Sequence, residues 1–116
     1  MLDNECIFCK IIKGEIPSSK VYEDEYVLGF RDISPVTPVH VLVVPKIHIK
    51  NVNEINEENV IYLEKIFKAI KEVAKVCNVS ESGYRVITNC GKDAGQTVEH
   101  LHFHVLGGEC LGEKLI

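Results

Sequence analysis

The segment EHLHFHVL, residues 99–106, constrains the fold more than any other part of the chain. Histidine and apolar residues alternate along it, and alternate side chains of a β-strand point to opposite faces of a sheet. One face can therefore enter a core while the other carries His100, His102 and His104, spaced by about 6.5–7 Å. The segment predicts a strand over Val98–Leu106 that is apolar on one side and rich in imidazole on the other.

Four further strands and one long helix are expected. The run Val39–Val44 is β-branched and apolar and is stopped by Pro45, which is typical of a central strand buried on both faces. Residues 57–77 predict the helix, with Asn56 as its N-cap. Its apolar stripe consists of Val60, Leu63, Ile66, Phe67, Ile70, Val73, Ala74 and Cys77. The other expected elements are a short helix or turn over residues 6–13 that ends at Gly14, and strands over Lys20–Glu23, Tyr26–Arg31 and Gly83–Thr88.

The order of these elements predicts an α+β fold. Strands that follow one another without intervening helices favour an antiparallel sheet. The 116 residues show no repeat or linker and are close to the commonest domain size, so we expect a single domain over 1–116.

Charge and composition exclude several classes of function. The net charge is −4, which argues against a long nucleic acid as partner, because that affinity needs many cationic contacts to phosphate. No apolar run approaches the ~20 residues of a membrane span, and the N-terminus carries no signal-peptide pattern, so the cytosol is the expected location. In that compartment we expect the five cysteines to be reduced and to be buried or to bind metal.

The three alternating histidines indicate chemistry. Neutral imidazole binds metals, attacks phosphorus or carbon, and exchanges protons near pH 7. The preceding loop, residues 89–97, contains Gly91 and Gly95, which allow backbone N–H groups to point at an anion. Its side-chain donors come from Asn89, Gln96 and Thr97. Beside the histidines this loop predicts a phosphate cradle.

Three segments resemble the histidine triad nucleotide-binding proteins of the Hint type: IFCKIIKGEIP (7–17), FRDISPVTPVHVLVVPK (30–46) and GQTVEHLHFHVLGG (95–108). The resemblance implies a five-stranded antiparallel sheet with one long helix, joined to a second sheet in a homodimer. It also implies hydrolysis of purine nucleoside phosphoramidates, with release of AMP or GMP through a nucleotidyl-histidine intermediate.

The resemblance also implies roles for individual residues. His102 matches the nucleophile, His104 the residue that assists the leaving group, and His40 a fourth histidine that supports them. Asp32 matches the carboxylate that holds the ribose hydroxyls. The apolar slot for the base matches Ile7, Phe8, Ile16, Phe30 and Ile33, and the phosphate contacts match Asn89, Gly95, Gln96, Thr97 and Val98.

A pair of cysteines, Cys6 and Cys9, has the spacing of a metal chelate, although a redox pair or two buried thiols would also fit. His48 and His100 are the natural remaining ligands for a zinc site, and the resemblance supports this set. Such a site would be structural and would leave His102 and His104 for catalysis, which itself needs no metal.

Two other functions compete with the phosphoramidase. One is a metal-dependent hydrolase in which His100, His102 and His104 hold an open zinc site. The other is a nucleotide-binding regulatory protein without significant turnover.

Overall fold

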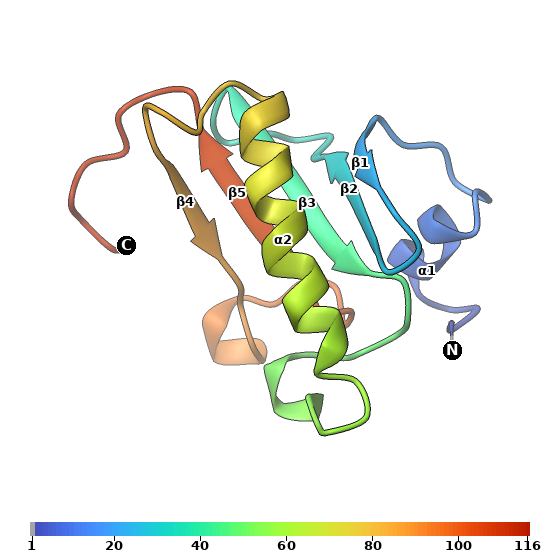
Figure 1. Ribbon diagram of the computed structural model, residues 1–116. Coiled ribbons are helices and arrows are strands. Elements are labelled where there is room, and N and C mark those ends of the chain that lie inside the picture. The colour runs from blue at the N-terminus through green and yellow to red at the C-terminus, as the bar shows by residue number, and fades with distance from the viewer. Residues whose placement is uncertain (1) are drawn as a thin grey trace.

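The computed structural model describes residues 2–116 and contains a five-stranded antiparallel sheet in the order β1-β2-β3-β5-β4 (Figure 1). The strands are β1 (Lys20–Glu23), β2 (Val27–Arg31), β3 (Val39–Pro45), β4 (Tyr84–Ile87) and β5 (Phe103–Gly107). The helices are α1 (Ile7–Ile12) and α2 (Ile61–Val76), and two single 3-10 turns lie at Val52–Glu54 and Lys92–Ala94. The predicted α+β class, with five strands and one long helix, is confirmed.

The central strand β3 is buried on both faces, as its apolar run predicts. It pairs with β2 on one side and with β5 on the other. Val41 and Val43 join the core on one face of the sheet, whereas Leu42 and Val44 join the core on the opposite face. The alternation of β3 therefore places apolar packing on both sides of the sheet.

The two helices cover opposite faces of the sheet. Ile66, Ile70 and Val73 of α2 pack into the first core, and Phe8 and Ile11 of α1 pack into the second (Figure 1). The site described below lies on the α1 side, because the apolar residues of β5 face α2 and its histidines face the other way.

The long helix begins later than predicted. Residues 57–60 form turns, and the regular helix starts at Ile61. Asn56 does act as a cap, but of this preceding turn: its Oδ1 accepts the N–H groups of Glu58 at 2.9 Å and Asn59 at 3.1 Å. The prediction that Asn56 acts as a cap is therefore confirmed, but Asn56 caps a turn over residues 57–60 and not the long helix.

Two members of the predicted apolar stripe of α2 are not core residues. Val60 is 50% exposed and Phe67 is 55% exposed, whereas Ala69, which the stripe omits, is fully buried. The helix thus presents Phe67 partly to solvent, where its ring packs edge-on against Phe103 of β5 with centroids 5.5 Å apart.

Strand β5 is shorter than the predicted strand over Val98–Leu106. Pairing begins at Phe103, which lies opposite Val43 of β3. Two residues further along β3 stands Pro45, which has no N–H to donate to the ladder. The chain before Phe103 leaves the sheet instead, and the N–H of Leu101 donates to the carbonyl of Ile49 at 2.6 Å.

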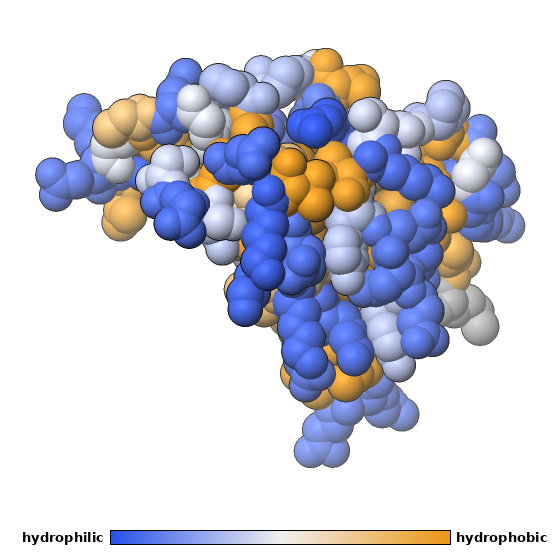
Figure 2. Space-filling view, turned by 45° about the horizontal axis from the view of Figure 1, so that its top comes forward, coloured by the Kyte–Doolittle hydropathy of each residue, from blue (hydrophilic) through white to orange (hydrophobic). Residues whose placement is uncertain are grey.

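The face of the molecule that carries α2 is mainly hydrophilic, with smaller apolar patches between the charged side chains (Figure 2). Within residues 2–116 no helix has both the length and the apolar character needed to cross a membrane.

Candidate active site and metal centre

A cavity of about 270 Å³ lies between α1, β2 and the chain that leads into β5. It is lined by Ile7, Phe8, Ile11, Ile16, Pro17, Ser18, Phe30, Arg31, Asp32, Ile33, Leu42, Thr97, Val98, His102 and His104. Apolar side chains dominate this lining, and one carboxylate and two imidazoles open into it. A larger cavity of about 620 Å³ under the C-terminal tail has no imidazole in its lining, so size alone does not identify the site.

The cavity brings together most of the site residues expected from the sequence. The residues expected for the base slot, together with Asp32, Thr97, Val98, His102 and His104, line it, whereas His40, Asn89, Gly95 and Gln96 do not. The sequence interpretation missed Ile11, Pro17, Ser18, Arg31 and Leu42. Ile11 follows Ile7 by one helical turn and Leu42 alternates with His40 on β3, so periodicity could have found these two.

His102 is held in one tautomer by a backbone carbonyl. Its Nδ1 lies 2.6 Å from the carbonyl oxygen of His100, which can only accept, so Nδ1 carries the proton. The lone pair of Nε2 is then available at the cavity. Phe8 packs edge-on against this ring, with centroids 5.1 Å apart, and burial lowers the pKa of His102 below 6.5. The ring thus presents an oriented lone pair to the cavity, which is the form in which an imidazole can act as a nucleophile.

His104 is oriented by a relay that starts at the backbone. The N–H of Val36 donates to His40 Nδ1 at 3.1 Å, so a neutral His40 carries its proton on Nε2. That Nε2 lies 2.9 Å from His104 Nδ1 and donates to it, which leaves the proton of His104 on Nε2. Burial lowers the pKa of His104 to about 4, so a neutral imidazole with an N–H donor is the resting form.

Asp32 stands at the end of this relay. Its Oδ1 accepts the N–H of Ser34 at 2.8 Å, and its Oδ2 lies 3.5 Å from His40 Nε2. Burial lowers the pKa of His40, and the charge of Asp32 opposes that shift. The carboxylate keeps free acceptor positions toward the cavity, which suits hydroxyl donors.

The same three side chains, Asp32, His40 and His104, have donor atoms within 4.8 Å of one another, which would suffice for a cation. However, a metal on His40 Nε2 would move its proton to Nδ1, directly opposite the N–H of Val36. Two donors would then face each other, so this group is a hydrogen-bond relay rather than a metal site.

The loop over residues 89–97 is held by its own polar side chains. Gln96 accepts the N–H of Gly91 at 2.9 Å and donates to the carbonyls of Lys50 and Val98 at 2.8 and 3.0 Å. Asn89 donates to the carbonyl of Ala94 at 2.8 Å. Their amide groups therefore shape the loop that places Thr97 and Val98 at the cavity.

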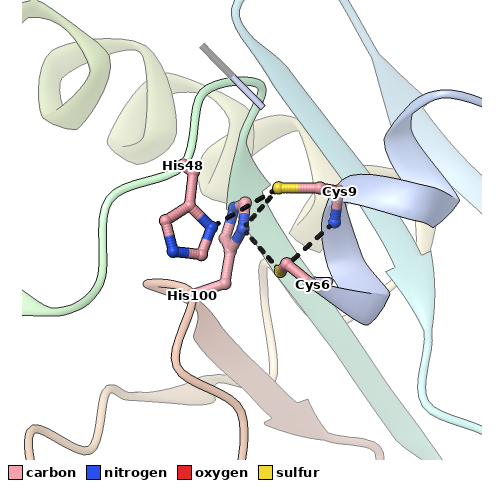
Figure 3. A group of neighbouring side chains, drawn as sticks. All are labelled: Cys6, Cys9, His48 and His100. Carbon is pink, nitrogen blue, oxygen red and sulfur yellow. Dashed lines mark hydrogen bonds between the residues drawn. The ribbon is translucent and has the colours of Figure 1, made fainter. Parts of the chain in front are cut away.

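A second group of side chains, which we call the thiol cluster, consists of Cys6, Cys9, His48 and His100 (Figure 3). Cys6 Sγ lies 3.3 Å from His100 Nδ1, and Cys9 Sγ lies 3.4 Å from His48 Nδ1 and 3.5 Å from His100 Nδ1. Around a tetrahedral zinc ion, sulfur and nitrogen ligands are roughly 3.6 Å apart, from Zn–S of about 2.3 Å and Zn–N of about 2.0–2.1 Å. The cluster could therefore hold a metal ion such as zinc.

Protonation also fits a metal at this place. His100 Nε2 donates to the carbonyl of Pro45 at 3.1 Å, which leaves the Nδ1 lone pair facing the thiols. Burial raises the pKa of the Cys9 thiol to about 11, so its thiolate needs a cation nearby.

The three alternating histidines do not share one metal. His100 faces the thiol cluster, His102 uses Nδ1 on a carbonyl, and His104 uses Nδ1 on His40. In the described part of the chain they do not form a group of converging ligand atoms. The geometry therefore disfavours the alternative zinc hydrolase.

The two sites are physically connected. Cys6 caps α1 by accepting the N–H of Cys9 at 3.4 Å, and Phe8, between the two cysteines, contacts the rings of His100 and His102. In addition, the carbonyl of His100 holds His102. Displacement of the cluster would thus disturb the apolar lining of the cavity and the His102 ring together.

This chain resembles known proteins along most of its length. The model of the HIT domain family matches residues 13–110. A purine nucleoside phosphoramidase from Escherichia coli (strain K12) is 44% identical over 111 residues, which is 96% of this chain and 93% of that protein. A solved HIT family hydrolase from Clostridium thermocellum superposes with a TM-score of 0.96 and 56% identity, covering 100% of both chains. A histidine triad nucleotide-binding protein from Candida albicans gives 0.79 and 38% over 96% of this chain and 86% of that one.

Proposed function

The chain belongs to the HIT domain family, and from this premise we propose that it hydrolyses purine nucleoside phosphoramidates to AMP or GMP. One observation carries the proposal: His102 lies in an apolar cavity with its Nδ1 proton held by a carbonyl and its Nε2 lone pair available. A nucleotide-binding regulator would not require an imidazole prepared in this way.

The reaction follows from the two tautomers. His102 Nε2 attacks phosphorus, a P–N bond to the histidine forms, and the P–N bond to the amine breaks. His104 Nε2 donates its N–H as a hydrogen bond to the departing nitrogen, which takes up a proton from solvent water as it leaves. Water then attacks phosphorus, the bond to His102 breaks, and the proton that this water loses passes to solvent. We propose that the Val98 N–H and the Thr97 hydroxyl stabilise the nonbridging oxygens, a role supported by the position of both residues in the cavity lining.

This function is tested by turnover of adenosine 5′-phosphoramidate. We expect many equivalents of AMP to be released per protein chain, and turnover to persist when a chelator is added during the assay. Tight AMP binding without turnover would instead establish the regulatory protein.

The pH profile tests the protonation states. Because burial lowers the pKa of His102, and that of His104 to about 4, each ring takes up its proton at a lower pH than an ordinary histidine does. We therefore expect the acid limb of kcat/KM to be centred below pH 6.5. Metal content should be measured at each pH, so that loss of metal is not mistaken for titration of a histidine. An acid limb centred at or above pH 6.5 would contradict the lowered pKa values of His102 and His104.

Asp32 is proposed to bind the ribose hydroxyls. Replacement of Asp32 by asparagine exchanges a charged acceptor for a neutral amide, so AMP affinity should fall about tenfold or more. Titration calorimetry measures this, and Glu81→Gln, which removes one negative charge from an exposed position, is the matched control. Equal affinities for the two variants would remove the ribose assignment.

The thiol cluster is proposed to bind one structural zinc ion through Cys6, Cys9, His48 and His100. When bound, the ion supplies a cross-link between the N-terminal segment, the chain after β3 and the chain before β5. It takes no part in the chemistry, because His102 and His104 each have other partners.

A homodimer is proposed from the exposed edge at β4. Tyr84 and Val86 are 38% and 36% exposed, and Val86 pairs with Val105, so both lie on the α2 face of the sheet, on which Phe67 is also exposed. Exposed apolar side chains of a sheet edge and of a helix on the same face form a surface that a second copy can cover.

Light scattering at micromolar concentration should therefore give twice the 13.0 kDa mass of one chain. Val86→Lys should shift that mass toward one chain, because it places a charge on the apolar edge. A wild-type protein with the mass of a single chain would reject the dimer.

A further inference from the structure

The four side chains of the thiol cluster differ in their access to solvent. Cys9 and His100 are both 0% exposed, whereas Cys6 and His48 are partly exposed. A metal ion therefore cannot reach the cluster from the side of Cys9 or His100 without opening a packed core.

A separate cavity of about 420 Å³ borders the exposed side of the cluster. Its lining includes Cys6 and His48 but neither of the buried ligands. Neither of the two cavities described above has any cluster ligand in its lining. Of these three cavities, this is the one whose lining includes donors of the thiol cluster.

The cavity is also negatively charged. Asp3, Glu5 and Glu99 line it together with a single cation, Lys50, whose Nζ lies 3.3 Å from Glu99. Asp3 accepts the N–H of Glu5 at 2.8 Å, and no ion pair to either carboxylate is found among residues 2–116. The two charges of Asp3 and Glu5 therefore remain to attract a cation at the mouth of the cluster.

We propose that this cavity is the route by which a divalent metal ion enters the thiol cluster, guided by Asp3 and Glu5, with Cys6 and His48 as the first ligands to bind. The proposal rests on the metal-binding role proposed above. As the ion advances to Cys9 and His100, each thiol releases its proton to the water of the cavity, so the ion exchanges with two protons.

Cobalt(II) entry into the metal-free full-length protein tests this route, since thiolate-bound cobalt absorbs visible light and needs no activity assay. The isosteric double variant Asp3→Asn/Glu5→Gln should bind cobalt roughly threefold to tenfold more slowly, with the same final spectrum. The variant Lys50→Gln should bind it faster, because it removes the opposing charge. The slowing should shrink in about 1 M salt, where charges are screened within about 3 Å.

The matched control is Glu57→Gln/Glu58→Gln, which removes two negative charges from exposed positions before α2. Entry that is equally fast in the cavity variant and the wild-type protein would overturn the route. Equal slowing by the control would also overturn it, because net charge would then be responsible. If the wild-type protein forms no thiolate–cobalt band, the proposed metal centre itself is wrong. This outcome differs from failure of the route alone, in which the band forms but its rate does not depend on Asp3 and Glu5.

Discussion

The variant His102→Ala should lose at least about 10³-fold in kcat while its affinity for AMP changes little. The nucleophile contributes chiefly to the transition state, because its Nε2 forms a bond only during the reaction. The ground-state contacts come from the apolar slot and from Asp32, which this substitution leaves in place.

Steady-state kinetics and calorimetric AMP binding measure the two parts of this prediction. The melting temperature of the variant should be recorded beside them, since His102 is buried against Phe8. A folded variant that retains kcat within about tenfold of wild type would show that another group attacks phosphorus.

The double variant Cys6→Ser/Cys9→Ser should unfold more than about 10 °C below the wild-type protein. A metal that binds the folded state but not the unfolded state raises the free energy of unfolding by about 4 kcal/mol when its free concentration is 1,000 times Kd. In a domain of this size each kcal/mol corresponds to several degrees of melting temperature. The substrate requirement should rise, because α1 carries Ile7 and Phe8 of the apolar slot. A measurable kcat should remain, because neither cysteine contacts His102.

Differential scanning calorimetry, metal analysis and kinetics check this prediction together. The control Cys90→Ser/Cys110→Ser removes two thiols outside the cluster and should change neither metal content nor melting temperature. A folded Cys6/Cys9 variant without any kcat would mean that the metal is catalytic. A wild-type protein that contains no zinc after purification in its presence would reject the site.

Much of the sheet could be predicted because its signals are local. The β-branched run at β3 and the alternation before Gly107 each fix a strand and its buried face within a few residues. The start of β5 could not be predicted in this way. The start of β5 depends on Pro45 of β3, which lies more than fifty residues earlier in the chain. Pro45 has no N–H to donate, so the hydrogen-bond ladder between β3 and β5 ends there.

The same distinction holds for α2. Helical periodicity predicts which residues share a stripe, but it does not state how wide the neighbouring sheet is. Phe67 follows the pattern and contacts Phe103 of β5, yet the sheet leaves it 55% exposed. Local capping chemistry at Asn56 similarly marks a chain reversal without stating whether a helix or a turn follows.

The identities of most residues in the candidate site could be predicted, but the hydrogen bonds that fix the tautomers of its histidines could not. The resemblance supplied the identities of the site residues, and the cavity brings together all but the loop residues Asn89, Gly95 and Gln96 among the nucleotide-binding set. The tautomers of His102 and His104 depend on one carbonyl and one N–H, from His100 and Val36. Backbone groups carry no signature in a sequence, so the relay that prepares the nucleophile and the proton donor becomes visible only in three dimensions.

The stereochemical course at phosphorus tests the central claim most directly. One epimer of adenosine 5′-thiophosphoramidate is hydrolysed in heavy-oxygen water, and the configuration of the labelled product is determined. Attack by His102 followed by attack by water inverts phosphorus twice, so we predict overall retention. Inversion would contradict the account, because it would require a single displacement by water without a nucleotidyl-histidine.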